Sequence, residues 1–357
     1  MRIAVTGLGL HTGLGRGVAD TWRRVIEPTM APTLPPDVST GYARAEQLSF
    51  SAIDESWQQA GLIAAEARGI GCTFSASKPL FMSNETVVSP GLLTDAVQAR
   101  YGLGGESRTI VAACATGAYA VALAADWITQ GVCDAVVTGS VEPRPHPLMA
   151  AGFQRMGVVS PDPVMRPFDR DRAGFVFGEG AGAIVLESEA HAMARGARPL
   201  AWLSGWARGA DGHSAVAFNS GGARIADVVR KALGKARLAP RDIGHVNAHG
   251  TATRLNDALE TQAIRRAFGD HAGALKISAT KSTTGHLLGA AGSVEFILTV
   301  LALREQRVPP TAHLSVPDPA CDLDYTPREA VAASFAHAAS LSFGFGGPIG
   351  ALVASRC

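Results

Sequence analysis

The chain has 357 residues, 47% of them hydrophobic and 18% charged, which is enough to bury one large core or two closely packed halves. Its formal net charge is +1, and its Lys and Arg residues are scattered rather than clustered, which argues against nucleic acid as a partner. No apolar run reaches the roughly 18 residues that suggest a membrane-spanning helix, so we expect no membrane span.

The cysteines and the first residues bear on where the protein works. The N-terminal MRIAVTGLGL lacks the charged start, long apolar core and cleavage site of a signal peptide. An odd number of cysteines without CxxC spacing argues against a disulfide framework and against a zinc site. The cysteines are Cys72, Cys114, Cys133, Cys321 and Cys357. We therefore expect a cytoplasmic protein that holds no metal.

Strand-like and helix-like segments alternate along the chain. Residues 2–10 predict a buried strand that leads through glycine turns into a helix over 18–27, and the proline-rich residues 28–40 predict a loop. Further strands are predicted at 108–113, 134–140, 182–187, 245–250, 275–280 and 350–355. This alternation is typical of an α/β fold.

Two helical segments, 118–128 and 293–303, are apolar on nearly every side. Helices of this kind are normally enclosed by other elements. Each follows a predicted strand and a short run of small residues. The similarity predicts two comparable halves that meet near residue 200, with their central helices in contact, although the sequence itself shows no clean repeat.

The segment VAACATGAYAVALAADWI places Cys114 between a predicted strand and a helix that begins at once. Such an elbow would lift the sulfur out of the sheet to the N-terminal end of the helix. There the helix dipole stabilises the thiolate, which is the nucleophilic form. Taken alone, Cys114 would be interpreted more simply as a buried core cysteine. The other cysteines lack this setting.

Two further segments carry histidines at predicted strand ends. NAHGTAT contains His249, and TKSTTGHLLGAAG places Lys281 and His286 in a glycine-rich turn before the second apolar helix. A fixed charge or an imidazole beside an apolar helix is costly unless it is paired or used. Three such segments, each after a strand, are hard to explain by packing alone.

The motifs CATGA, NAHGTAT, TKSTTGHLLGAAG and SFGFGG (342–347) resemble, in order, the active-site motifs of the β-ketoacyl-acyl carrier protein synthases. The similarity is to the Cys-His-His branch, which elongates fatty acids and aromatic or polyene polyketides. RPFDRDRAGFVFGEGAG (166–182) and PDPACDLDYTP (317–327) are typical of that branch as well. The resemblance extends from Met1 to about Ser355.

This resemblance implies a thiolase-like α/β fold, with two pseudo-repeated halves in five layers. Residues 1–198 would form the half that carries the cysteine, and residues 199–357 the half that carries the histidines and the lysine. The protein would form a homodimer, or a heterodimer with a ketosynthase-like subunit. No cofactor would be needed, because the substrates arrive on the phosphopantetheine arm of an acyl carrier protein.

The resemblance also implies a role for each motif residue. Cys114 would take an acyl group from a carrier-protein thioester, and His249 and His286 would hold the thioester carbonyl of malonyl-carrier as it loses carbon dioxide. The carbanion would attack the Cys114 thioester, and the backbone N–H groups of Cys114 and Phe345 would form an oxyanion hole. Lys281 resembles the structural lysine of the family, which biases a neighbouring histidine toward neutrality.

Other positions match supporting residues of the family. Asp257 and Glu260 match its acidic pair, and Glu260 is expected to pair with Lys281. Thr251 and Thr253 match the threonines that hydrogen-bond the pantetheine arm. The expected gate over the cysteine consists of Phe153, Gly344, Phe345, Gly346 and Gly347.

The chain also departs from the family pattern. It is shorter than typical members before Cys114, where elongating enzymes build part of the acyl pocket and the dimer edge. Leu341 stands in place of an Asn before SFGFGG, and Pro348-Ile349 in place of Thr-Asn after it. We expect Pro348 to stiffen the glycine hinge and Leu341 to remove a polar anchor.

Four alternative functions share some features with this sequence. TGLGLHTGLG after the first strand resembles the fingerprint of short-chain NAD(P)-dependent oxidoreductases, but no Tyr is followed four residues later by Lys. A papain-like hydrolase would share the spacing of Cys114 and His249, but the residues around the cysteine do not match its motif. A non-elongating partner subunit of the chain-length-factor type would typically have lost the cysteine. Thiolases and Cys-His-Asn synthases stay open, although the latter carry Asn where His286 stands.

Overall fold

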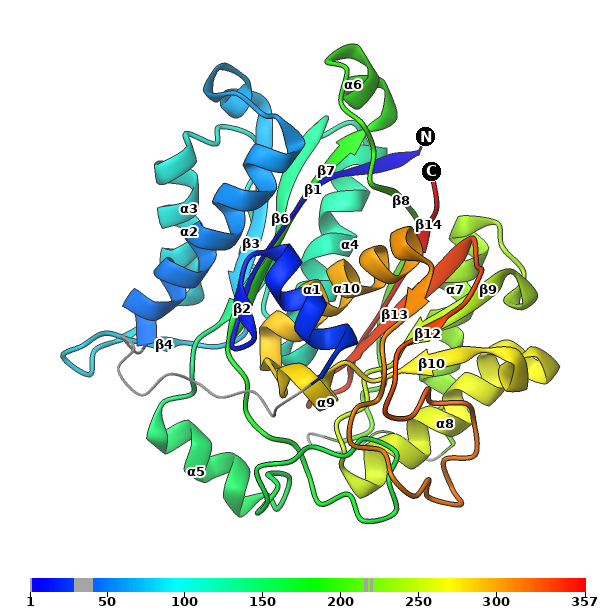
Figure 1. Cartoon of the computed structure of the whole chain (residues 1–357). Helices are drawn as coiled ribbons and strands as arrows, with labels where there is room; N and C mark the ends of the chain where they lie inside the picture. The colour runs from blue at the N-terminus through cyan, green and yellow to red at the C-terminus, as the bar shows by residue number, and fades with distance from the viewer. Residues whose placement is uncertain (1, 29–40, 215–217, 219–220) are drawn as a thin grey trace.

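The computed structural model describes the chain apart from residues 1, 29–40, 215–217 and 219–220 (Figure 1). The predicted loop over 28–40 therefore lies, beyond its first residue, outside the described residues. Ten strands of the described chain form one sheet, in which β2 (Gly15–Arg16) pairs with the end of β1. The order of the others is β10 (Lys276–Ser278), β9 (Ile243–Asn247), β13 (His337–Phe343), β14 (Pro348–Ser355), β8 (Ala201–Ala210), β1 (Ile3–Thr12), β7 (Gly180–Ser188), β6 (Ala135–Glu142) and β3 (Ile70–Ala76).

The sheet consists of two sets of strands that are built alike. In the β1 set, β1 is antiparallel to β7, β7 is antiparallel to β6, and β6 is parallel to β3. In the β8 set, β8 is antiparallel to β14, β14 is antiparallel to β13, and β13, β9 and β10 are parallel. The first strands of the two sets, β1 and β8, pair antiparallel and join the sets edge to edge.

Helices cover both faces of each set (Figure 1). They are α2 (Gly41–Ala60) and α3 (Pro90–Tyr101) outside the β1 set, α7 (Ala223–Ala236) and α8 (Arg254–Phe268) outside the β8 set, and α4 (Thr116–Thr129) and α10 (Ala291–Glu305) between the sets. Successive strand residues point to opposite faces. Accordingly, Ile184 of β7 packs into the central core and Val185 into the α2–α3 core. The arrangement is α/β in five layers, as predicted.

The two apolar helices meet at their N-terminal ends, where small residues allow close approach. A Cβ atom placed on Gly117 would lie 2.4 Å from the backbone nitrogen of Ser293, and one on Gly292 would lie 2.5 Å from that of Ala118. Both helices are therefore in direct backbone contact there, as predicted. This contact brings together the segments that precede the two helices, which are the segments that contain Cys114 and His286.

Most predicted elements are confirmed within a few residues, but the strand over 108–113 was wrong. Arg108 N donates to Cys72 O at 3.0 Å, so the segment begins alongside β3. Ile110 N then donates to the side-chain oxygen of Ser75 at 2.7 Å, and the ladder stops. Because β3 is the last strand of its set, the segment has a neighbour on one side only. It lies where β10 lies in the other set.

The remaining described elements are short or peripheral. They are α1 (Val18–Ile26), β4 (Leu80–Phe81), β5 (Val87–Val88), α5 (Pro147–Arg155), α6 (Glu189–Ala194), α9 (Lys281–Thr284), β11 (Arg307–Val308), β12 (Val331–Ala332) and the 3₁₀ turns η1 (Ala64–Gly69), η2 (Ala113–Ala115), η3 (Pro240–Asp242), η4 (Gly269–Ala274) and η5 (Leu288–Ala290). No helix within the described ranges is both long and apolar enough to cross a membrane.

Candidate active site

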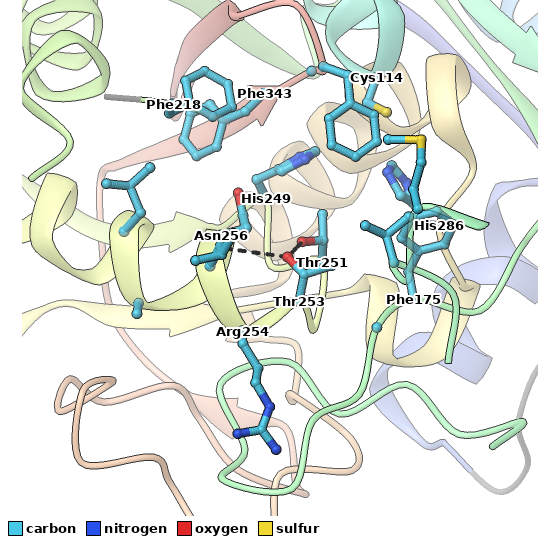
Figure 2. A pocket seen from close by; sticks show the side chains of 18 of the residues that line it. Cys114, Phe175, Phe218, His249, Thr251, Thr253, Arg254, Asn256, His286 and Phe343 are labelled. Carbon is cyan, nitrogen blue, oxygen red and sulfur yellow. Dashed lines mark hydrogen bonds between the residues drawn. The ribbon is translucent and has the colours of Figure 1, made fainter. Parts of the chain in front are cut away.

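A cavity of about 760 Å³ lies at the carboxyl ends of β9 and β13 and at the start of α4, where Cys114 is located (Figure 2). Of the residues singled out from the sequence, it is lined by Cys114, His249, Thr251, Thr253, His286, Gly344 and Phe345. Lys281, Asp257 and Glu260 are fully buried next to these residues. The fold therefore brings together residues that lie more than a hundred positions apart in the sequence.

Cys114 lies in η2, directly before α4, and is 7% exposed. The elbow is held by Thr116, whose hydroxyl accepts from Ala112 N at 2.9 Å and donates to Ala113 O at 2.8 Å. Ala113 has a φ of +47°, a backbone conformation that costs energy in any residue with a Cβ atom. The predicted elbow is thus present, although an irregular segment rather than a strand leads into it.

Burial and nearby charges act in opposite directions on the Cys114 thiol. Burial raises the pKa of Cys114 to about 11, while the positive charges of Lys281 and Lys78 lower it and Glu295 raises it. Burial thus favours the protonated thiol, and the two lysine charges favour the thiolate. The thiol proton has to leave as the sulfur reacts.

His286 is held by backbone groups and an aromatic ring. The backbone N–H of His286 donates to Val176 O at 2.7 Å, and the ring Nδ1 accepts from Leu288 N at 3.2 Å. The ring of Phe175 meets the imidazole edge-on at 4.9 Å between centroids, as Figure 2 shows. Because Nδ1 accepts a hydrogen bond, it carries no proton. The neutral ring therefore has its proton on Nε2.

His249 reaches the same tautomer through buried charges. Its Nδ1 lies 3.4 Å from Nζ of Lys281, which also donates to His249 O and to Oε1 of Glu295, both at 2.5 Å. An ammonium group can only donate, so Nδ1 of His249 must accept. Burial, together with Lys281, holds the pKa of both His249 and His286 well below its usual range. Both rings are neutral, and each has an N–H on Nε2.

The predicted ion pair between Glu260 and Lys281 was wrong. Lys281 pairs with Glu295 of α10, and both side chains are buried. Glu260 instead accepts from the backbone N–H groups of His249 at 2.6 Å and Gly250 at 2.8 Å. Burial raises the pKa of both glutamates to about 7. Glu260 therefore fixes the loop that carries His249.

Asp257 joins the other family motifs to this loop. Its Oδ2 accepts from Phe168 N at 2.8 Å and lies 3.7 Å from Nε of Arg172. Burial raises the pKa of Asp257 to about 6, although the bond from Phe168 and the charge of Arg172 lower it. Phe168 stacks on Tyr325 at 3.7 Å, and Arg172 pairs with Asp318 at 2.5 Å. The segments 166–182 and 317–327 thus support the wall of the cavity.

The two threonines predicted to bind pantetheine lie side by side at the start of α8. Their hydroxyl oxygens are 3.0 Å apart, which is one of the dashed lines in Figure 2. Thr253 also caps α8 by accepting from Asn256 N at 3.4 Å. Both side chains line the cavity, so their hydroxyls can bond to a molecule in it.

The glycine turn between β13 and β14 lies directly against Cys114. A Cβ atom on Gly344 would lie 3.0 Å from Cys114 N and 3.0 Å from Cγ of Pro348. Among the described residues, the turn is closed by bonds from Gly344 N to Pro348 O and from Gly347 N to Gly344 O, and the N–H of Phe345 takes no part in these bonds. The backbone of Phe345 therefore remains available to a group on the cysteine.

Phe345 and Phe153 are in contact as predicted. Their ring centroids are 6.3 Å apart and the rings are inclined by 28°. Phe153 also packs edge-on against Phe175 at 5.8 Å and Phe177 at 5.7 Å. The aromatic cluster thus links the glycine turn to the ring that packs on His286.

The sequence analysis missed two buried glutamates. Glu295 is the only charged residue in the apolar segment 293–303, and that isolation was a signal. Glu142 ends β6 and pairs with Lys78, and no motif pointed to either residue. Among the described residues, no group of three or more His, Cys, Asp or Glu side chains is arranged to hold a metal ion.

Comparison with known proteins identifies the family of the chain. The models of the β-ketoacyl synthase N-terminal and C-terminal domains match residues 35–192 and 200–315. The chain is 33% identical over 407 residues to 3-oxoacyl-[acyl-carrier-protein] synthase 2 of Coxiella burnetii, covering 99% of this chain and 98% of that one.

Solved structures give the same result. A ketosynthase solved in complex with its type II PKS acyl-carrier protein is 26% identical, with a TM-score of 0.91 over 100% of this chain and 99% of that chain. The ishigamide ketosynthase/chain length factor is 28% identical, with a TM-score of 0.91 over 100% of this chain and 99% of that one. The protein is therefore an acyltransferase of the condensing class. It belongs to the β-ketoacyl synthase family.

Proposed function

We propose that the protein condenses an acyl group bound to Cys114 with malonyl-acyl carrier protein, with loss of carbon dioxide, to give β-ketoacyl-acyl carrier protein. One observation carries this proposal. Cys114, His249 and His286 line one cavity, and both histidines are held neutral with their protons on Nε2. A thiol beside two preorganised N–H donors suits a reaction that first transfers an acyl group and then develops an enolate.

In the first step the sulfur of Cys114 attacks the carbonyl carbon of an acyl-carrier thioester. The oxyanion that forms would be bound by the backbone N–H groups of Cys114 and Phe345. As the intermediate collapses, the bond to the pantetheine sulfur breaks, and that sulfur takes up the proton that Cys114 has lost. The pantetheine arm would be oriented by hydrogen bonds to Thr251 and Thr253.

In the second step malonyl-carrier loses carbon dioxide, and the electrons of the broken carbon–carbon bond form an enolate. The Nε2–H groups of His249 and His286 would donate to its oxygen. A neutral imidazole gives up this proton less readily than an imidazolium, so it can stabilise the enolate without quenching it. The enolate carbon attacks the Cys114 thioester, the new carbon–carbon bond forms, and the thiolate of Cys114 leaves and is reprotonated.

The overall organisation is proposed on the same basis. Residues 1–198 and 199–357 form the two halves, which the matching strand orders and the two family models support. The partners are an acyl carrier protein and a second ketosynthase-like subunit, in fatty-acid or specialised polyketide or polyene biosynthesis. No cofactor beyond the pantetheine arm is needed. A cytoplasmic location agrees with cysteines that are all free.

A non-elongating partner subunit is the alternative, because one similar solved structure is described as a ketosynthase/chain length factor. The two functions differ in their need for Cys114. Incubation with a panel of acyl-carrier thioesters, followed by intact-protein mass, distinguishes them. We expect an acyl adduct on the wild type that is absent from Cys114→Ala and retained in Cys321→Ala. No adduct on the wild type with any thioester, or an adduct that survives Cys114→Ala, would contradict the proposal.

A further inference from the structure

A second buried ion pair lies close to the site, and the proposed function does not use it. Lys78 follows the end of β3, and its Nζ contacts Oε1 of Glu142, the last residue of β6. The side chains are 15% and 0% exposed. Moving two charges out of water costs free energy, so a buried ion pair is not explained by solubility and suggests a structural or functional role.

The position of Lys78 matches that of His249 in the other set of strands. β3 is the strand parallel to β6 in the β1 set, and β9 is the strand parallel to β13 in the β8 set. Lys78 is the second residue after β3, and His249 is the second residue after β9. The two residues thus follow equivalent strand ends of the two sets.

Glu142 connects Lys78 to the turn that holds His286. Its Oε2 accepts from the hydroxyl of Ser77 at 2.6 Å and from Gly289 N at 3.2 Å. The preceding residue, Leu288, donates its N–H to Nδ1 of His286. Leu288 has a φ of +44°, a strained conformation that persists only where its surroundings impose it. The ion pair is therefore one hydrogen bond and one peptide linkage away from Leu288 N, the donor that sets the His286 tautomer.

Packing reinforces this connection. A Cβ atom on Gly289 would lie 2.2 Å from the Cβ atom of Ser77, so the end of β3 and the turn η5 are in direct contact. Leu288 and Cys114 belong to the same buried cluster. A continuous set of contacts thus joins the end of β3 to the turn of His286 and to Cys114.

The charge of Lys78 also acts on the site. It lowers the pKa of Cys114 and of His286, as Lys281 does from its place beside His249. Burial lowers the pKa of Lys78 itself to about 8, and its contact with the carboxylate of Glu142 favours the charged form.

We propose that Lys78 and Glu142 are a positioning pair, which holds the turn that presents His286 and places a second positive charge near Cys114. The expected effect of the pair on turnover rests on the proposed function. The charged or titratable groups that act on the thiol are Lys281, Lys78 and Glu295, and the neutral rings of His249 and His286 line the same cavity.

The test compares full-length wild type with Lys78→Met, Lys78→Arg and a control, Lys276→Met. Lys276 also pairs with an acidic residue, Asp324, but it is not among the charged groups that act on the thiol. The first readout is the rate of Cys114 alkylation by iodoacetamide against pH, resolved by peptide mass. The second is carbon dioxide release from malonyl-carrier, measured as kcat and KM separately in a Cys114→Ala background.

Lys78→Met should lower alkylation at neutral pH by on the order of tenfold, because one pKa unit changes the thiolate fraction tenfold. It should also lower kcat for carbon dioxide release and leave KM unchanged. Lys78→Arg should restore the alkylation profile, since it restores the charge. Lys276→Met should behave like the wild type.

A wild-type profile in Lys78→Met, or the same loss in Lys78→Arg and Lys276→Met, would overturn the inference. If Lys78→Met does not fold, Glu142→Gln takes its place, and undiminished carbon dioxide release in that variant would overturn it as well. Alkylation does not depend on condensation. If the wild type forms no acyl adduct while its alkylation still responds to Lys78, the proposed function fails and the effect of Lys78 on the thiol remains.

Discussion

His249 is surrounded by buried charges, whereas His286 is surrounded by backbone groups and an aromatic ring. Lys281 faces Nδ1 of His249, and Glu295 neutralises that lysine. Leu288 N fills the same role at Nδ1 of His286, with the Phe175 ring against its edge. The imidazoles lie 5.6 Å apart, nearly perpendicular to each other. Two different environments thus give the same chemical result, a neutral ring with a proton on Nε2.

The difference lies in what each arrangement requires of the fold. A buried charge network needs every partner, because a missing one leaves an uncompensated ion. A backbone donor cannot be removed by substitution and depends only on the conformation of its turn. We therefore expect the His249 side to respond directly to changes in charge. The His286 side should respond to changes in what holds its turn, which are the packing around it and the Lys78–Glu142 pair.

The largest effect is expected when either ring is removed. In a Cys114→Ala background, His249→Ala and His286→Ala should each lower carbon dioxide release from malonyl-carrier by on the order of a hundredfold or more, because each loses one donor to the enolate. Released carbon dioxide is the measurement, and Cys114→Ala alone is the control. Normal decarboxylation by His286→Ala would contradict the two-histidine mechanism.

Lys281→Met should separate the two environments. It removes the donor to Nδ1 of His249 and leaves Glu295 unpaired, so the free energy of unfolding should fall by about 3 kcal/mol and decarboxylation by on the order of tenfold or more. Phe175→Leu, the matched change beside His286, should cost about 1 kcal/mol and reduce decarboxylation only a few-fold. Chemical denaturation and carbon dioxide release measure the two quantities.

The double variant Lys281→Met/Glu295→Leu makes the comparison sharper. Removing both charges at similar volume should recover much of the stability, because no buried ion is left unpaired. Decarboxylation should stay low, because His249 still lacks its donor. If activity returns together with stability, Lys281 supports the fold and does not set the tautomer.

His245, on the strand before His249, does not line the cavity, so its substitution tests stability separately from catalysis. His245 is buried in β9, its Nε2 lies 2.9 Å from the Ser278 hydroxyl, and burial lowers its pKa to about 3. Its unfolded form takes up a proton below its ordinary pKa, while its folded form does not. Its stability contribution is therefore present above about pH 6.5 and is lost as the pH falls toward 3.

In the wild type His245 should make the free energy of unfolding fall as the pH drops below about 6.5. His245→Gln should reduce this slope by on the order of 1 kcal/mol per pH unit. The contribution of Glu260 to the free energy of unfolding changes with pH in the opposite direction. Its pKa is raised to about 7, so this contribution is lost as the pH rises through that value. Urea denaturation at several pH values measures the slope. An unchanged slope in His245→Gln would show that other groups control it.

The sequence predicted cavity residues through motifs that are specific in combination, and His249 and Phe345 follow strands whose ends the fold gathers in one place. It failed where the outcome depends on neighbours. The segment 108–113 has the composition of a strand but runs beside the last strand of a set. Glu295 and Glu260 are both acidic residues near Lys281, and only the folded chain shows that Glu260 is occupied by backbone donors.

Strands of small residues were also missed. β13 has the sequence HAASLSF and is covered by helices on both faces, so it lacks the β-branched run and the alternation that signal a strand. Leu341 lies in this strand and packs into the core beside α7 and α8. Its expected effect on the glycine turn is therefore indirect, since its side chain points away into that core.

The smallest expected effect concerns Phe345, which lies between the glycine turn and the aromatic cluster on the His286 side. Pro348 fixes a φ angle next to Gly347 and packs against Gly344, so we expect the turn to move over a narrow range. Phe345→Ala should raise malonyl decarboxylation by the unacylated enzyme a few-fold, because the ring no longer distinguishes an empty cysteine from a loaded one. Carbon dioxide release with and without a prior acyl group on Cys114 measures this, with Phe218→Ala as a control on another ring that lines the cavity.

Structures of the enzyme with and without an acyl group on Cys114 should differ in the backbone of 344–347. Identical backbones, together with unchanged kinetics in Phe345→Ala, would leave the segment as a structural turn before β14.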